Sequence, residues 1–213
     1  MKLYGYWRSS AVYRVRIALH HKGIPFEVVP INLLAGEQLD ARYRDVNPQG
    51  LVPTLVDGDR LFHQSLAILE YLEETHPSPP LLPTPPHERA RVRALADLIA
   101  CDVHPLQNTR VGLYLIEKLG HTEEERLTWF RHWMTAGLAA FEELVARSPS
   151  TGRFCHGDRV TMADVLLVPQ LGNARRVECD LEAFPTLTRI EAECLALESF
   201  QKAHPDQQPD ARP

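Results

Sequence analysis

The chain has few cysteines and none of the cysteine spacings that build zinc sites or disulfide frameworks. Its 213 residues include four, which stand far apart at Cys101, Cys155, Cys179 and Cys194. The absence of a C-x-x-C pair excludes the common zinc ribbons, and the scatter is unlike a small disulfide-stapled secreted domain. We therefore expect reduced thiols that are mostly buried.

Other features are also missing. No apolar run approaches the roughly 20 residues that span a bilayer, and the N-terminus lacks the basic, apolar and small-residue succession of a signal peptide. Lys and Arg number 23 against 28 Asp and Glu, for a net charge of -5, which favours neither a nucleic-acid nor an acidic-membrane partner. The ten histidines form no H-x-x-x-H or H-E-x-x-H spacing, so a metal-dependent enzyme is disfavoured. The sequence predicts a cytoplasmic protein that binds no metal.

Proline, by contrast, is plentiful and concentrated between residues 76 and 86, where it interrupts any helix or strand. Before this break, predicted strands at 28–33 and 53–56 alternate with helices such as 66–74, as in an α/β unit. After it, apolar residues at three- and four-residue spacing predict helices at 89–101, 123–147, 162–176 and 185–200. We predict an α/β domain over residues 1–80 and an all-helical domain over 87–213, with a fraying tail at 205–213.

The most informative segment is the junction between a short strand at 2–6 and the first helix. Ser9 and Ser10 stand at this junction, directly after Arg8. The free N–H groups and the dipole at a helix start favour negative charge, so a hydroxyl here can face an anionic ligand. It can also serve as an ordinary helix cap, which is the favoured interpretation on spacing alone.

Two further segments are also candidates for contact with a ligand. Val52 and Pro53 follow a turn-rich loop and form a candidate cis peptide bond, which would open the Val52 backbone to an extended peptide ligand. Gln64 and Ser65 precede an amphipathic helix whose first N–H groups can hold a carboxylate. For Ser65 as well, a plain cap is the alternative.

A third motif has a structural interpretation. Thr161 and Asp164 have the spacing of a capping box ahead of an apolar helix. We expect their loss to cost roughly 0.5 to 2 kcal/mol of stability, with no direct effect on chemistry.

In this order, the serine pair, the Val-Pro loop, the Gln-Ser pair and the Thr-x-Ala-Asp box resemble the zeta class of cytosolic glutathione transferases. This class contains maleylacetoacetate and maleylpyruvate isomerases. The resemblance covers essentially the whole chain. It implies a thioredoxin-like N-terminal domain, a helical-bundle C-terminal domain, a glutathione site between them and a homodimer.

The resemblance also implies residue roles. Ser9 and Ser10 would lie near the glutathione thiol, where hydroxyls and a helix start favour the nucleophilic thiolate. The resemblance places the Val52 backbone at Pro53 against the cysteinyl part of glutathione, Gln64 and Ser65 at its γ-glutamyl carboxylate, and Gln38 at its glycyl end. It also implies contacts from His104 and Asn108, one of which would reach across a dimer interface. A purely structural role for His104 is an equal alternative.

The sequence departs from the class pattern at two positions. Ala11 and Tyr13 stand where many zeta-class sequences carry cysteine and tryptophan. The reactive sulfur must therefore come from glutathione, and we favour maleylpyruvate over maleylacetoacetate as the substrate. Arg8, Arg110 and Arg176 are candidates for binding a small dicarboxylate, because guanidinium groups pair with carboxylates; solvated surface positions are the alternative.

The implied reaction is a glutathione-dependent cis–trans isomerisation by thiolate addition, bond rotation and elimination. A general glutathione transferase or a glutathione-dependent dehalogenase would share the same glutathione contacts. A non-enzymatic binding module is a more distant alternative. Isomerisation regenerates glutathione, whereas conjugation consumes it, so a product assay separates the first two.

Overall fold

The computed structural model describes residues 1–211, which form two compact units. The first unit comprises Met1–Leu81 together with the residues from Leu195 onward, and the second comprises Leu82–Cys194. The predicted architecture, a thioredoxin-like α/β unit and an all-helical unit, is confirmed.

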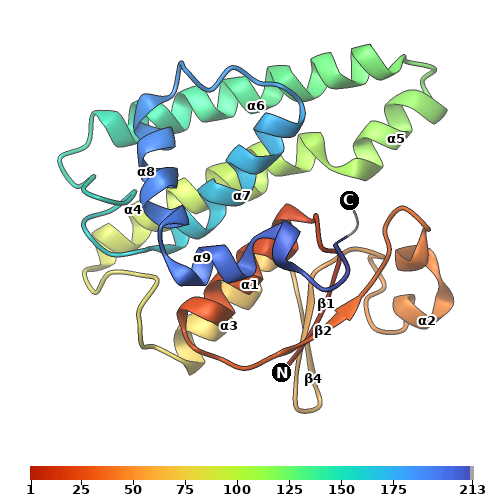
Figure 1. Ribbon diagram of the computed structural model, residues 1–213, viewed down its shortest axis with the longest axis horizontal. Helices are drawn as coiled ribbons and strands as arrows, with labels where there is room; N and C mark the ends of the chain where they lie inside the picture. Colours follow the sequence, from red (N-terminus) through yellow and green to blue (C-terminus); the bar gives the residue numbers. More distant parts are fainter. Residues whose placement is uncertain (212–213) are drawn as a thin grey trace. The chain divides into compact units, whose positions relative to one another are not determined.

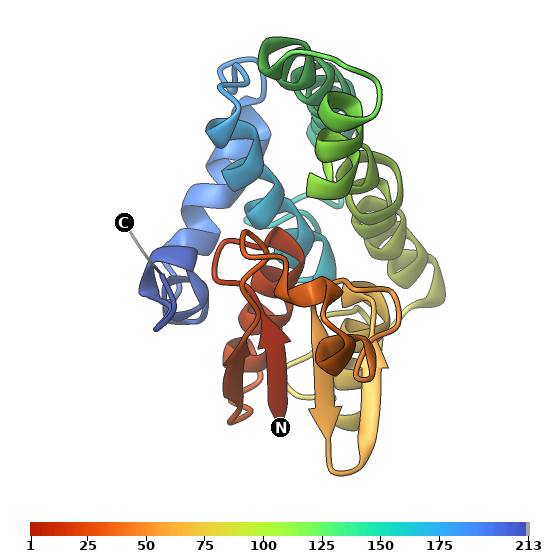
Figure 2. The same cartoon turned by 90° about the vertical axis from the view of Figure 1, so that its right-hand side faces the viewer.

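The first unit is built on a four-stranded mixed sheet (Figure 2). The strand order is β2-β1-β3-β4, with β1 parallel to β2 and antiparallel to β3, and β3 antiparallel to β4. The strands are β1 (Lys2–Gly5), β2 (Glu27–Pro30), β3 (Thr54–Asp57) and β4 (Arg60–His63). Predicted strands at 28–33 and 53–56 correspond to β2 and β3, whereas β4 was not predicted.

Helices α1 (Ser10–His21) and α3 (Ser65–Thr75) pack side by side on this sheet (Figure 1). Every residue of α1 from Ser10 to Leu19 is buried, because α3 and the sheet cover one side and α9 (Glu198–Ala203) covers another. Two short elements, η1 (Glu37–Leu39) and α2 (Ala41–Arg44), lie between β2 and β3 in the chain.

The regular elements of the second unit are helices, as predicted, and one isolated β-bridge joins Thr151 to Gly157. Its helical segments are α4 (Pro86–Asp97), the π-helical η2 (Leu98–Val103), η3 (His104–Gln107), α5 (Thr109–Glu117), α6 (Glu123–Ala146), α7 (Met162–Arg176) and α8 (Pro185–Leu195). Its core contains Leu138, Phe141 and Leu166, each with no exposed surface. The predicted helix over 185–200 is two helices, α8 and α9, separated by two residues.

The C-terminal segment differs from the prediction. Instead of completing the helical domain expected over 87–213, the residues after Leu195 group with the first unit. Phe200 and Ala203 are fully buried, and their carbonyl oxygens accept hydrogen bonds from Tyr13 Oη (3.3 Å) and Arg16 Nε (3.0 Å). The expected fraying of 205–213 is wrong for residues 205–210, which include η4 (Pro205–Gln207) and hydrogen-bonded side chains; residues 212–213 lie outside the described part.

The proline-rich break is held by a buried ion pair. Lys22 Nζ lies 2.8 Å from Glu73 Oε2 and also donates to the carbonyl oxygens of His76 and Pro79. Glu73 Oε2 in turn accepts from the backbone N–H of Leu81. A single lysine thus fixes the chain where it leaves α3.

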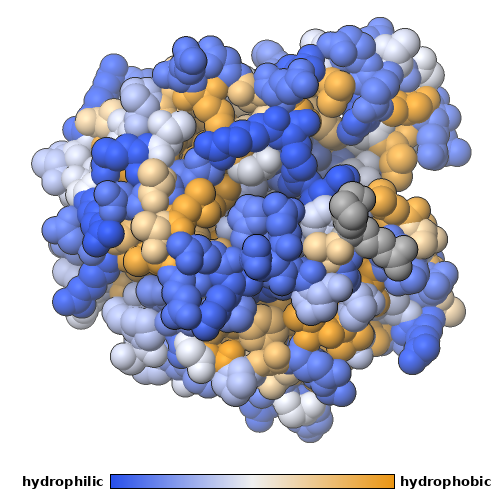
Figure 3. Space-filling model, in the orientation of Figure 1, coloured by the Kyte–Doolittle hydropathy of each residue, from blue (hydrophilic) through white to orange (hydrophobic). Residues whose placement is uncertain are grey.

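Polar side chains cover most of the face in Figure 3, among smaller apolar patches. Within residues 1–211, no helix is long and apolar enough to cross a membrane, and no cluster of three potential metal ligands occurs.

All four cysteines are free. Cys155 and Cys194 are buried, whereas Cys101 is exposed, so the expectation of mostly buried thiols holds for only part of the set.

Candidate functional site

The strand register brings three predicted loops to one end of the sheet. Tyr4 in β1 pairs with Thr54 in β3, and Thr54 pairs with His63 in β4. The end of β1, the start of β3 and the end of β4 therefore lie next to one another. The segments that continue from these points are the turn at 6–10, the Val52–Pro53 loop and the Gln64–Ser65 junction.

At the first loop, the structure shows Ser9 as the N-cap of α1. Its Oγ accepts from the N–H of Val12 over a long 3.4 Å, so the plain-cap interpretation is correct as geometry. Because Oγ acts there as an acceptor, the hydroxyl proton can still be donated to a ligand. Ser10 is the first helical residue and is buried, and α1 has no acidic residue in its first turn. Negative charge placed beside Ser9 therefore meets the positive end of the helix without local repulsion.

Arg8 precedes this cap and is exposed. Its guanidinium lies 5.7 Å from the centre of the Trp7 ring, within the range of a cation–π contact. The side chain is thus supported by its neighbour while its charge stays accessible.

The second loop presents an open backbone. The Val52–Pro53 peptide bond is cis, as the sequence suggested. Within residues 1–211, neither the N–H nor the C=O of Val52 forms a hydrogen bond. The preceding residue is well fixed, because Leu51 O accepts from both Tyr43 Oη (2.7 Å) and Asn47 Nδ2 (2.8 Å).

The third junction carries a strained backbone. Gln64 has φ 67°, a left-handed conformation that is uncommon for a residue with a Cβ and that occurs often at ligand sites. Its side chain reaches back to the second loop, where Nε2 donates to Gln49 Oε1 at 2.9 Å. Gln49 was not identified from the sequence, although it lies in the turn-rich loop already noted.

Ser65 is not the N-cap of α3, which was the alternative interpretation of this residue from the sequence. It is the first residue of α3, and its Oγ accepts from Nη1 of Arg14 at 3.1 Å. Arg14 is only 1% exposed, so a guanidinium lies behind the start of α3. From its place inside the first helix, Arg14 is a better candidate for a structural or interface pair than for a substrate contact, and the partner found here, Ser65, is 51 residues away in the chain.

Gln38 lies in η1, close to the second loop. A Cβ on Gly50, which has φ 62°, would stand 2.9 Å from the Gln38 carbonyl oxygen, so glycine permits this close approach. The side-chain Oε1 of Gln38 is buried and has no partner within residues 1–211. Buried acceptors are nearly always satisfied, so this oxygen is available to accept from a donor on a bound ligand.

The remaining predicted residues belong to the helical unit. Asn108 caps α5, and its Oδ1 accepts from the N–H of Arg110 at 3.1 Å. His104 is half-buried at the start of η3, directly after a π-helical segment of a kind that is frequent at functional sites. The Gln107 side chain donates to Gln170 at 2.7 Å and so joins η3 to α7, six residues before Arg176.

The arginines differ in their surroundings. Arg110 and Arg176 are both exposed, and Arg176 donates to the side chain of Asn173. The adjacent Arg175 instead pairs with the buried Glu191, and the hydrogen bond to this carboxylate raises the pKa of Arg175. Of the two consecutive arginines, Arg175 therefore has the structural role.

The capping box of α7 lies in the core of the helical unit, as its structural interpretation requires. Asp164 is completely buried and accepts from Thr161 N, Thr161 Oγ1 and Cys155 N, at 2.7, 2.7 and 2.8 Å. Burial raises the pKa of this carboxyl, although these hydrogen bonds oppose the shift.

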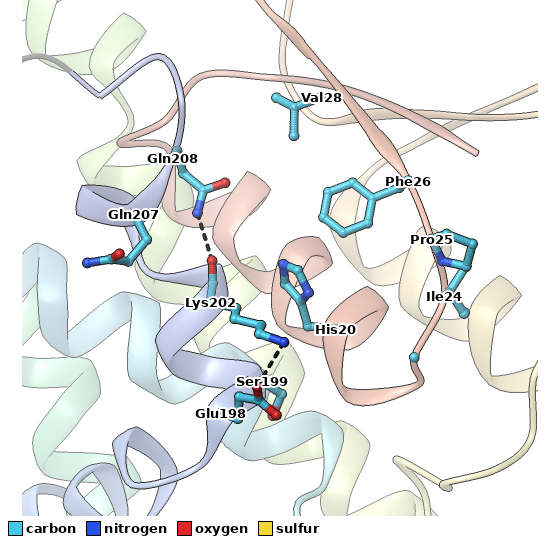
Figure 4. Close-up of a pocket in the computed structure, with 11 residues that line it drawn as sticks. His20, Ile24, Pro25, Phe26, Val28, Glu198, Ser199, Lys202, Gln207 and Gln208 are labelled. Atoms are coloured by element: carbon cyan, nitrogen blue, oxygen red, sulfur yellow. Dashed lines mark hydrogen bonds and ion pairs between the residues drawn. The ribbon is translucent and has the colours of Figure 1, made fainter.

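A separate cavity of about 680 Å³ lies in the first unit (Figure 4). Its walls come from the end of α1, from β2, from α9 and from η4, and they include none of the predicted site residues. Among its lining residues, Lys202 Nζ lies 2.8 Å from Glu198, and the His20 ring packs edge-on against Phe26. Burial, with Lys202 nearby, lowers the pKa of His20. This cavity is therefore not the candidate site.

Comparison with known proteins agrees with the geometry. The sequence profile of the glutathione S-transferase N-terminal domain matches residues 3–80. Maleylacetoacetate isomerase of Rhizobium meliloti is 50% identical over 205 residues (96% of this chain, 95% of the relative), and maleylpyruvate isomerase of a Ralstonia species is 44% identical over 211 residues (99% and 100%).

Solved structures match over the whole chain as well. A maleylpyruvate isomerase, a bacterial zeta-class glutathione S-transferase in its holo form, superposes with a TM-score of 0.98 at 43% identity and covers 100% of both chains. Maleylacetoacetate isomerase from Methylobacterium extorquens AM1, with bound malonate and glutathione, has a TM-score of 0.97 at 46% identity, again over 100% of both chains.

Proposed function

Because the chain belongs to the zeta class of the glutathione S-transferases, we propose that it is a glutathione-dependent cis–trans isomerase of a small dicarboxylate, with maleylpyruvate preferred to maleylacetoacetate. The observation that carries the proposal is the start of α1. There Ser9 has a hydroxyl proton to donate, the first turn has no acid, and Ala11 stands where a protein thiol would otherwise be. Such a site stabilises a thiolate that the ligand must bring.

The residues at the end of the sheet fit glutathione, a short peptide with two amides and two carboxylates. The open Val52 backbone can pair with the cysteinyl part, as in strand addition. The buried Gln38 Oε1 can accept a hydrogen bond from a peptide N–H. Gln64 and Ser65, at the start of α3 and with Arg14 behind them, suit a carboxylate.

The first unit then activates the thiol. Bound glutathione supplies a thiolate nucleophile that adds reversibly to the conjugated double bond, which permits rotation, and is recovered unchanged. Ser9 donates a hydrogen bond to the sulfur, and the N-terminus of α1 favours its negative charge. Ser10, whose side chain is buried, acts by fixing the start of the helix.

In this proposal the arginines serve the second substrate. Arg8, Arg110 and Arg176 hold its carboxylates and stabilise the negative charge that develops on its carbonyl oxygen. Asn108 uses its Oδ1 in the cap of α5, which leaves its amide NH₂ to donate to glutathione, and His104 adds a second polar contact. A homodimer, the state implied by the resemblance, is part of the same proposal.

The test follows both the product and the thiol. Purified protein is incubated with maleylpyruvate or maleylacetoacetate, with and without glutathione. Formation of the fumaryl isomer without loss of thiol supports the isomerase. Loss of one thiol per molecule of product would instead identify a conjugating transferase, which the same glutathione contacts could serve.

A further inference from the structure

The C-terminal segment, residues 204–211, is bonded to the turn that carries Arg8 and Ser9, and both belong to the first unit. The backbone N–H of Trp7 donates to Asp210 Oδ2 at 3.1 Å. Its backbone C=O accepts from Arg16 Nη2 at 2.8 Å. Two charged side chains, one from each end of the chain, therefore hold both backbone groups of Trp7.

The position of Asp210 is well anchored. Two residues earlier, the buried Gln208 donates its Nε2 to the carbonyl oxygens of Lys202 (3.0 Å) and His204 (2.8 Å), the first of which is drawn in Figure 4. The ring of His204 also packs edge-on against Tyr13 in α1. These contacts tie the C-terminal segment to α9 and α1 directly before Asp210.

Two charged side chains, the buried Arg16 and the half-buried Asp210, flank the Trp7 peptide group. Arg16 is 1% exposed, and burial lowers its pKa to about 10, while the Asp210 carboxylate opposes that shift. Arg16 thus remains charged at neutral pH. Asp210 Oδ1 is buried and has no hydrogen-bond partner within residues 1–211. The carboxylate is therefore held through Oδ2, which accepts from the Trp7 N–H.

The contacts within this turn link Trp7 to both Arg8 and Ser9. Ser9 N donates to Tyr6 O at 3.0 Å across Trp7, and the Trp7 ring supports the guanidinium of Arg8. Any rotation of the Trp7 backbone would move both Arg8 and the Ser9 hydroxyl. Displacements of about 1 Å at reacting groups can cost as much as 10²-fold in rate.

We propose that Asp210 is a positioning residue for the isomerisation: by holding the Trp7 backbone against Arg16, it sets the positions of Arg8 and Ser9, so that the C-terminal segment is part of the active site. The inference rests on the roles proposed above for Arg8 and Ser9.

The test compares three variants. Asp210→Ala removes the acceptor, Asp210→Asn keeps an oxygen that can accept from the Trp7 N–H, and Asp206→Ala removes an equal charge from the same segment at an exposed position. For each we would measure the pKa of the thiol in bound glutathione, kcat, KM for glutathione and hydrogen exchange at the Trp7 amide.

Asp210→Ala should accelerate exchange at Trp7, raise the thiol pKa and lower kcat by about tenfold. Asp210→Asn should restore most of each value, and Asp206→Ala should match the parent. Parent values for the thiol pKa and kcat in Asp210→Ala would overturn the inference, as would an Asp210→Asn variant as impaired as the alanine.

Two controls keep the outcome interpretable. If Asp210→Ala does not fold, Asp210→Asn and Asp210→Ser supply the comparison, with the thiol pKa as the deciding value. If the parent itself shows no glutathione-dependent isomerisation, the proposed function fails. Exchange at Trp7 still tests whether Asp210 holds the turn, so the two failures are distinct.

Discussion

Replacing Asp164 with alanine should destabilise the helical unit much more than a capping-box change at an exposed site. The carboxylate is completely buried and accepts from the backbone N–H groups of Thr161 and Cys155 as well as from the Thr161 hydroxyl. Alanine removes all three acceptor contacts.

The magnitude follows from the groups that lose a partner. Two buried N–H groups lose their acceptor at about 1–3 kcal/mol each, and one of them, that of Thr161, is the capping interaction itself. We therefore expect the free energy of unfolding to fall by roughly 3–5 kcal/mol. This exceeds the 0.5–2 kcal/mol expected for a capping box alone, because the bond from Cys155 fastens a separate loop to α7.

The chain contains its own control. In α6, Thr122 and Glu125 form the same reciprocal box, with Thr122 N to Glu125 Oε2 at 2.7 Å and Glu125 N to Thr122 Oγ1 at 3.2 Å, but both residues are exposed. Glu125→Ala should shift the urea midpoint far less than Asp164→Ala. Equal shifts would refute the argument from burial. Altered turnover per folded molecule in Asp164→Ala would refute the purely structural interpretation.

Four further changes have defined outcomes. Ser9→Ala should raise the thiol pKa of bound glutathione in an ultraviolet titration, and an unaltered titration would remove Ser9 from the mechanism. Arg176→Ala should lower turnover of the dicarboxylate while the Kd of glutathione stays nearly constant; unchanged turnover would exclude this arginine. Lys22→Met leaves the buried Glu73 without its cation and should lower the free energy of unfolding by about 3–5 kcal/mol in urea, so a negligible change would contradict the ion-pair argument. Burial lowers the pKa of His20 in the folded protein, so the unfolded chain binds the proton more readily. The free energy of unfolding should therefore fall as the pH drops below about 6.5, the ordinary pKa of histidine. His20→Gln should flatten that part of the profile of Tm against pH, and a profile parallel to the parent's would show that His20 is not responsible.

Elements with a clear apolar pattern could be predicted from the sequence, whereas the strand β4 was missed. The helix expected over 123–147 is found at Glu123–Ala146, since many turns repeat the same apolar spacing. The strand β4 has the sequence Arg-Leu-Phe-His, in which polar and apolar residues do not alternate. Its turn at Gly58, with φ 62°, follows Asp57 in the Asp-Gly pattern that favours a hairpin, so this strand was within reach of the sequence.

The site residues divide into those that have a local signal in the sequence and those that depend on a partner distant in the chain. Ser9 and Gln64 could be found because a helix start is a local feature that favours anions. Arg14, Gln49 and Asp210 could not, because each acts through a partner that folding brings from elsewhere in the chain. The docking of α9 on α1 was missed for the same reason, since it depends on the carbonyl oxygens of residues remote in sequence.

The most direct test of the central claim, that glutathione acts as a recovered cofactor in an isomerisation, is turnover with substrate in large excess over glutathione. Purified protein would be mixed with excess maleylpyruvate, and the fumaryl product and free thiol would be quantified together until the reaction stops. We predict complete conversion with the thiol undiminished. Product that stops at one equivalent per glutathione, with the thiol consumed, would contradict the account and identify a conjugating enzyme.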